Sequence, residues 1–236
     1  AVVEGRALWG AVRDAVAILV GGNIGEISFT VLGSLVSGQT PLNARQLLLV
    51  NLLTDALPAL TVAVRPPAGQ RPEQLLKEGP EASLGKSLTR ELLTRATITG
   101  GVATGAWGVA RLGGTQRGAQ TVGLMALIGT QIGQALLAGG RDRTIAASAV
   151  GSGIGMFLAV QTPGVSQFFG CRPLGPIGMA QAATAIGIGT GASAVLPLLI
   201  ERWGDKLDGN GALRHSLNAW SRRARELDWM PDLWSG

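Results

Sequence analysis

The sequence predicts an all-α membrane protein, a six-helix transmembrane bundle with cytoplasmic N- and C-termini. Six stretches are apolar over roughly the 17–25 residues that a tilted helix needs to cross a bilayer: 8–36, 42–64, 92–112, 119–139, 144–162 and 178–200. Charged residues make up only 15% of the 236 residues, and the mean hydropathy is +0.30. Crossing six times from the cytoplasm leaves sixteen of the twenty Lys and Arg residues inside, a positive-inside pattern. Buried helices of a soluble protein are the alternative for the Gly- and Ala-rich last three segments.

The first two segments form a predicted hairpin, the domain of residues 1–64. The short polar stretch 37–42 joins them on the outer side. Pro41 is well placed to start the second helix, because its missing N–H would have no helical partner there.

Two carboxylates, Glu26 and Asp55, lie inside these two apolar segments. An ionisable side chain in a membrane span costs several kcal/mol by common scales, about 3 kcal/mol or more, and usually marks an ion path or binding site. Residues three or four apart share a helix face. Asn23 therefore projects with Glu26, and Asn51 and Thr54 project with Asp55.

If the hairpin packs, these five oxygen-bearing side chains converge near mid-membrane. Hard cations prefer oxygen ligands, and Ca²⁺ tolerates irregular sets of them. Pro58 has no N–H, so the carbonyl of Thr54, four residues earlier, loses its helical donor and needs a protein group, water or an ion instead. The pattern predicts a cation site. The alternative is that the two carboxylates only make polar contacts between helices.

Three further regions follow the hairpin. The sequence predicts a cytoplasmic loop at 65–91, four more transmembrane helices within 92–200, and a cytoplasmic amphipathic tail at 201–236. Glycines four apart recur in the later helices, as in Gly129 with Gly133, and are expected at close helix contacts. If the tail is helical, its basic amphipathic pattern suits a membrane surface or packing on a cytoplasmic domain.

The sequence lacks the residue patterns that are typical of several other function classes. The net charge of +5 is explained by membrane orientation, so no nucleic-acid partner is expected. Cys171 is the one cysteine and lies in a predicted outer loop. Glycine runs such as AIGIGTGASAV fall within helices rather than after a strand, so no nucleotide-binding loop is expected. No catalytic residue is predicted.

Two blocks of sequence resemble P-type cation-transporting ATPases, in the group that contains the calcium and sodium/potassium pumps. EGRALWGAVRDAVAILVGGNIGE and PLNARQLLLVNLLTDALPALTVAVRPP are similar to the fifth and sixth transmembrane helices of that family. The later segments resemble its seventh to tenth helices in number and spacing. By this resemblance Asn23, Glu26, Asn51, Thr54 and Asp55 stand where the family binds its transported ion.

The resemblance implies the C-terminal, ion-translocating membrane region of an ATP-driven pump in a bacterial plasma membrane. Its expected partners are the lipid bilayer, the actuator, nucleotide-binding and phosphorylation domains, and the first four membrane helices. This chain lacks the DKTGT and GDGxND motifs. It should therefore hold no cofactor and show no ATPase activity alone, with ATP and Mg²⁺ serving the complete enzyme.

The transported ion is expected to be Ca²⁺ or another divalent cation. Two-site calcium pumps use a glutamate in the eighth helix, and the residue here that corresponds by resemblance is the neutral Gln131, which favours a single site. A small channel, a secondary transporter and a degenerate pump remnant are the alternatives.

Overall fold

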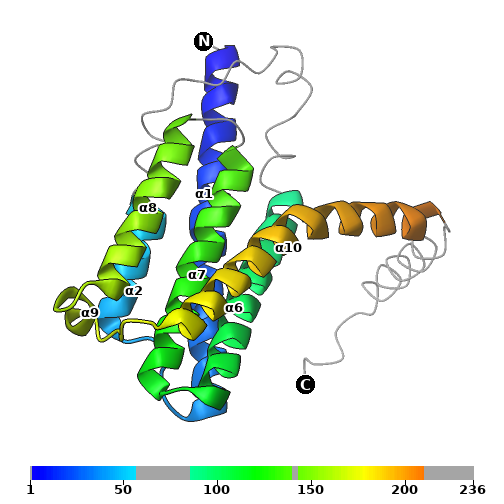
Figure 1. Cartoon of the computed structure of the whole chain (residues 1–236). Coiled ribbons are helices and arrows are strands. Elements are labelled where there is room, and N and C mark those ends of the chain that lie inside the picture. The colour runs from blue at the N-terminus through cyan, green and yellow to red at the C-terminus, as the bar shows by residue number, and fades with distance from the viewer. Residues whose placement is uncertain (1, 57–85, 140–142, 210–236) are drawn as a thin grey trace, which may run out of the picture. The chain divides into compact units, whose positions relative to one another are not determined.

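The computed structural model describes residues 2–56, 86–139 and 143–209, and all regular structure in these ranges is helical (Figure 1). The elements are α1 (Val2–Ser37), α2 (Ala44–Asn51), η1 (Leu52–Ala56), α6 (Lys86–Gly113), α7 (Gln116–Gly139), α8 (Arg143–Gln161), α9 (Val165–Phe168) and α10 (Pro176–Gly209). The protein is thus an all-helical membrane bundle, as predicted. The predicted loop is described only from Lys86, and the tail only to Gly209.

Helix ends depart from the predicted segments in informative places. α6 begins at Lys86, six residues before 92, and an ion pair of 3.0 Å between Glu91 and Arg95 spans its first turns. The second helix begins at Ala44 rather than at Pro41. Asn43 caps it, because its side chain accepts from the Gln46 N–H while Gln46 accepts from the Asn43 N–H. A reciprocal cap satisfies two N–H groups, which explains why the helix starts there.

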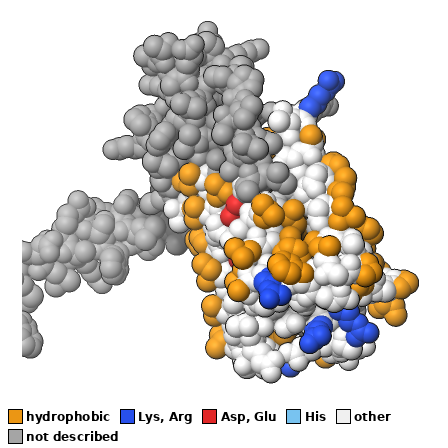
Figure 2. Space-filling view, turned by 90° about the vertical axis from the view of Figure 1, so that its left-hand side faces the viewer, with side chains coloured by type: hydrophobic (Ala, Val, Ile, Leu, Met, Phe, Trp, Pro, Cys, Tyr) orange, Lys and Arg blue, Asp and Glu red, His pale blue; other side chains and the backbone are white. Residues whose placement is uncertain are grey.

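Among the described residues, four helical stretches are long and apolar enough to cross a membrane: Val16–Ser37, Gln116–Ala138, Arg143–Gln161 and Pro176–Pro197. Large apolar side chains cover their outward faces, as at Ile27 and Leu35, which are 62% and 78% exposed. Among the side chains coloured in Figure 2, several basic ones lie toward the lower end of this face, and apolar side chains cover much of the surface above them. Exposed apolar surface of this kind fits lipid rather than water.

The core of the first unit (Ala1–Ser193) is a chain of neighbouring helices. α1 packs on α6, α6 on α7, and α7 on α8. Phe29, Trp107 and Leu124 are fully or almost fully buried between them. Gly129 and Gly133 let α7 approach α10, because a side chain at either would overlap Ile186 or Thr190. The close contact predicted for this glycine pair is confirmed. The same prediction is wrong for Gly101 with Gly105 and for Gly187 with Gly191, which face open space.

The segment around α9 holds the start of α2. Arg45 donates to the Phe168 carbonyl at 2.7 Å and lies over the Phe168 ring, and Asn43 donates to the Phe169 carbonyl at 3.0 Å. Gln46 reaches the buried Cys171 sulfur at 3.5 Å. We call this set of contacts the α9 clasp. It fixes the end of α2 that is predicted to face outward.

The second unit (Ala194–Gly236) is described only as the last part of α10, to Gly209.

Candidate cation site

The polar groups of the candidate site come from the middle of the predicted hairpin. α1 carries Asn23 and Glu26, and η1 carries Thr54 and Asp55. Glu26 lies eleven residues before the end of α1 and Asp55 eleven residues after the start of α2, so both are about 16 Å along their helices from the same end of the bundle. The two carboxylates therefore lie at a similar depth.

The helix that carries Asp55 changes its winding at the site. α2 is α-helical to Asn51, and Leu52–Ala56 then form a π-helical turn. π turns insert extra width into a helix and are frequent at functional sites. Within this turn Thr54 is 4% exposed, and its hydroxyl donates to the Val50 carbonyl at 3.0 Å and lies 3.2 Å from Asp55 Oδ1.

The hairpin does bring its two helices together at these residues. Asn23 Nδ2 lies 3.5 Å from Asp55 Oδ2, a long hydrogen bond between α1 and η1. Glu26 and Asp55 also interact electrostatically. Asn23, Glu26, Thr54 and Asp55 thus form one cluster, whereas Asn51 is exposed on α2. Pro58 lies outside the described residues, so the prediction for the Thr54 carbonyl stays a prediction.

Gln131 joins this cluster from α7. Its side-chain N–H donates to Glu26 Oε1 at 3.3 Å and to the Gly22 carbonyl at 3.4 Å. Glycine at 22 permits this approach, because a Cβ there would lie 3.2 Å from the Gln131 oxygen. Glu26 is 5% exposed, so Gln131 supplies a polar partner to a carboxylate that water hardly reaches.

The carboxylates are not neutralised by basic side chains in the described part of the chain. There, neither Glu26 nor Asp55 forms an ion pair with Lys or Arg. The partner of Glu26 is the Gln131 amide, and those of Asp55 are the Asn23 amide and the Thr54 hydroxyl. Within the same ranges no group of three or more His, Cys, Asp or Glu could hold a metal alone. A cation here would be held by two carboxylates with amide, hydroxyl and backbone oxygens.

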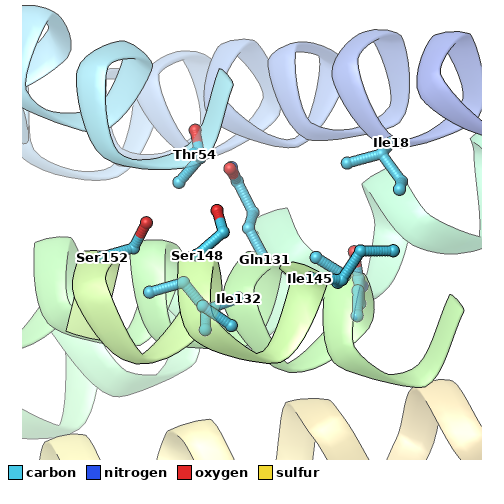
Figure 3. A pocket seen from close by; sticks show the side chains of 10 residues that line it. Ile18, Thr54, Gln131, Ile132, Ile145, Ser148 and Ser152 are labelled. Atoms are coloured by element: carbon cyan, nitrogen blue, oxygen red, sulfur yellow. The ribbon is translucent and has the colours of Figure 1, made fainter. Parts of the chain in front are cut away.

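A small cavity adjoins the cluster. The centre of a water molecule can occupy about 20 Å³ of this cavity, which is enough for roughly one water. Figure 3 shows Gln131, Ser148 and Ser152 pointing from α7 and α8 toward the helix that carries Thr54. Ser152 donates to the Leu53 carbonyl at 2.6 Å, whereas the Ser148 hydroxyl is buried and has no partner within the described residues.

A second set of buried polar residues was not predicted from the sequence. Gln134 bonds Thr99 at 3.3 Å and Ser193 at 3.0 Å, and Ser148 and Ser152 line the cavity. A spacing signal was present, because Gln131 with Gln134 and Ser148 with Ser152 are three and four residues apart within apolar helices. Neutral side chains cost less in a membrane span than carboxylates do, so they are a weaker indication of a site.

Comparison with known proteins identifies the family. A family model described as "Cation transporting ATPase, C-terminus" matches residues 39–203.

This chain belongs to the cation-transporting ATPase family.

Relatives place this ATPase region within longer proteins. It is 43% identical over 216 residues to "Probable cation-transporting ATPase I" of Mycobacterium leprae, a match that covers 84% of this chain and 13% of the relative. It is 31% identical over 100 residues to the "Calcium-transporting ATPase" of Bacillus subtilis, covering 42% and 11%. It is 39% identical over 66 residues to "P-type sodium-transporting ATPase4" of Toxoplasma gondii, covering 28% and 5%.

The family match makes this the C-terminal membrane part of a P-type cation ATPase. The chain spans about an eighth of the length of the mycobacterial relatives that it matches. The named cations differ between relatives, being calcium in one and sodium in another.

Proposed function

We propose that this region supplies the ion-translocation site of an ATP-driven pump, with Asn23, Glu26, Thr54 and Asp55 as ligands of the transported cation. The observation that carries the proposal is the meeting of two carboxylates, without a basic partner in the described residues, at a π turn inside the membrane bundle. Uncompensated buried charge is costly. A cation arriving between the two carboxylates offsets that cost.

The ligand set favours a divalent cation, and Ca²⁺ first. Two carboxylates match a double positive charge, and the remaining ligands are oxygens of uneven geometry, which Ca²⁺ accepts more readily than Mg²⁺ does. Asn23 now turns its N–H toward Asp55. A half-turn of that amide would present its oxygen instead, because the two ends of the group are nearly the same shape. Asn51 is exposed here, and it stays a further proposed ligand only by the family resemblance.

The remainder of the pump is part of the same proposal. The mycobacterial relatives extend far beyond this region. ATP, Mg²⁺ and the aspartyl phosphate would belong to actuator, nucleotide-binding and phosphorylation domains elsewhere in the polypeptide. This region would lie in a bacterial plasma membrane with cytoplasmic termini. Its own residues bind the cation, orient it and keep it from water.

Substitution of Asp55 tests the site. In the complete ATPase that carries this region, Asp55→Asn should abolish Ca²⁺-dependent phosphorylation from [γ-³²P]ATP, because the site loses one of its two negative charges at nearly constant volume. The measurement is phosphoenzyme formed against the concentration of Ca²⁺, Mg²⁺, Mn²⁺, Na⁺ or K⁺. The cation that drives phosphorylation of the unsubstituted protein identifies the transported ion.

Glu91→Gln is the matched control, because it removes a carboxylate of α6 that lies outside the cluster. It should leave the half-activating ion concentration within about twofold of the unsubstituted value. An Asp55→Asn protein with unchanged ion dependence would remove Asp55 from the site. Loss of folding is monitored by gel filtration and circular dichroism of each variant.

A further inference from the structure

We propose that Ser152 on α8 is a positioning residue for the cation site. It stabilises the π-helical winding of the turn that carries Thr54 and Asp55. This proposal rests on the proposed function of the same site. Ser152 is 1% exposed, and its hydroxyl donates to the carbonyl of Leu53 at 2.6 Å. Leu53 lies inside η1, one residue before Thr54 and two before Asp55.

The Leu53 carbonyl needs an external donor for a chemical reason. In a π turn a carbonyl accepts from the N–H five residues later, which for Leu53 would be residue 58. That residue is proline, whose nitrogen carries no hydrogen in any conformation. A buried carbonyl without a donor is destabilising, because it has given up its hydrogen bond to water. The short bond from Ser152 removes that destabilisation for the π winding.

α8 is shaped to bring this hydroxyl to the turn. Ser152 is followed three residues later by Gly155, where a Cβ would lie only 2.9 Å from the Leu53 side chain. The glycine therefore admits the Leu53 side chain while the serine bonds the Leu53 carbonyl. Ser152 thus fixes the main chain of Leu53, and Gly155, on the same face of α8, makes room for its side chain.

The consequence for the ligands follows from the winding. A π turn carries one more residue per turn than the α-helix, so it rotates the side chains that follow it. If the turn rewinds as α-helix, Thr54 and Asp55 change direction relative to Asn23 and Glu26. The hydroxyl of Ser152 touches no ligand, and it acts through the backbone. Its loss should therefore weaken cation binding without removing any charge.

Ser148 supplies a matched control. It lies one turn before Ser152 on the same helix and lines the same cavity, but its hydroxyl has no partner within the described residues. Ser148→Ala removes the same group from the same surroundings without touching Leu53. Ser152→Thr retains the hydroxyl, and the adjoining cavity offers space for its methyl group.

Two readouts on the complete ATPase test the proposal. Equilibrium binding of ⁴⁵Ca²⁺ should show a dissociation constant about tenfold higher for Ser152→Ala, with the number of sites unchanged. Ser152→Thr should recover to within about threefold, and Ser148→Ala should stay within twofold. Hydrogen–deuterium exchange of the peptide spanning 47–57 should be faster in Ser152→Ala than in Ser148→Ala.

The two proposals fail in different ways. If the unsubstituted ATPase binds no ⁴⁵Ca²⁺ and no cation drives its phosphorylation, the proposed function is wrong, while the exchange measurement still decides whether Ser152 holds the turn. If binding is normal and Ser152→Ala matches Ser148→Ala in affinity and exchange, the role of Ser152 is overturned and the site assignment stands. An equal loss of Ca²⁺ affinity in Ser152→Ala and Ser148→Ala would indicate an effect of the polarity of the cavity. That result would also overturn the role of Ser152.

Discussion

At the scale of single residues, the site balances its charges with neutral donors. Glu26 receives an N–H from Gln131, and Asp55 receives one from Asn23 and lies 3.2 Å from the Thr54 hydroxyl. A Lys or Arg in their place would hold the carboxylates more strongly, because charge-assisted bonds are roughly twice as strong as neutral ones. Neutral partners leave the carboxylates bonded but still available to an arriving cation.

Cys171 offers a residue-scale test of the α9 clasp. The thiol is 5% exposed, and burial raises its pKa, since the thiolate is disfavoured away from water. Its maleimide labelling in the folded protein should be slow. Because the raised pKa keeps the thiol protonated, the rate should still be rising steeply at pH 9, where that of a free thiol is levelling off.

Gln46→Ala should accelerate that labelling several-fold, because it removes a contact to the sulfur and half of the reciprocal cap of α2. Gln120→Ala is the control, since Gln120 bonds the Thr40 carbonyl at the same end of the bundle and does not touch Cys171. Labelling after denaturation in detergent gives the amount of label incorporated when the thiol is fully accessible. Equal rates in the two variants would show that Gln46 does not secure the clasp.

At the scale of helices, the tight contacts are carried by small residues. In a membrane, apolar surface alone does not favour helix association, because lipid chains are as apolar as leucine. α7 instead approaches α10 through Gly129 and Gly133 and bonds it through Gln134. The helix that contributes Gln131 to the site is therefore fixed by packing on a second helix.

Gly129→Leu should disrupt this contact, because even the first side-chain carbon would overlap Ile186. Overpacking of this kind costs roughly 1–3 kcal/mol, so the thermal midpoint in detergent should fall by several degrees. Gly105→Leu is the matched control, as a side chain there meets nothing nearby. Its midpoint should change little. Equal midpoints in both variants would contradict close packing at Gly129.

Sequence patterns predicted the helices better than their ends and their winding. Apolar length alone located the helices because a bilayer requires it. The cluster of Asn23, Glu26, Thr54 and Asp55 followed from spacing along two helices, although its role as ligand set stays a prediction. The π turn and the exposure of Asn51 were missed, because a regular α-helix was assumed through Asp55. The contact of Ser152 with Leu53 joins residues 99 apart, which helical spacing cannot reveal.

At the scale of the whole molecule, the described part is organised around a site contacted by four of its elements. α1 and η1 carry the carboxylates, α7 brings Gln131, and α8 brings Ser152. The α9 clasp holds the start of α2. The start of α2 is therefore fixed. If the ligands move, the change in backbone conformation should be confined to the residues between that start and η1.

The shared depth of Glu26 and Asp55 has an electrical consequence. About 16 Å from one end of a hydrocarbon layer roughly 30 Å thick is near its middle. A cation that moves between the site and one side of the membrane then crosses about half of the transmembrane potential. That is worth about 1 kcal/mol per elementary charge for each 100 mV.

Release of the cation to either side should accordingly be voltage-dependent and should move a measurable charge. Transient currents from the complete ATPase, adsorbed as membrane fragments on a planar bilayer, would record it after photorelease of ATP. The charge per cation should correspond to about half of the membrane field, and Asp55→Asn should remove it. A current whose size does not change with voltage would place the site close to one surface rather than at mid-depth.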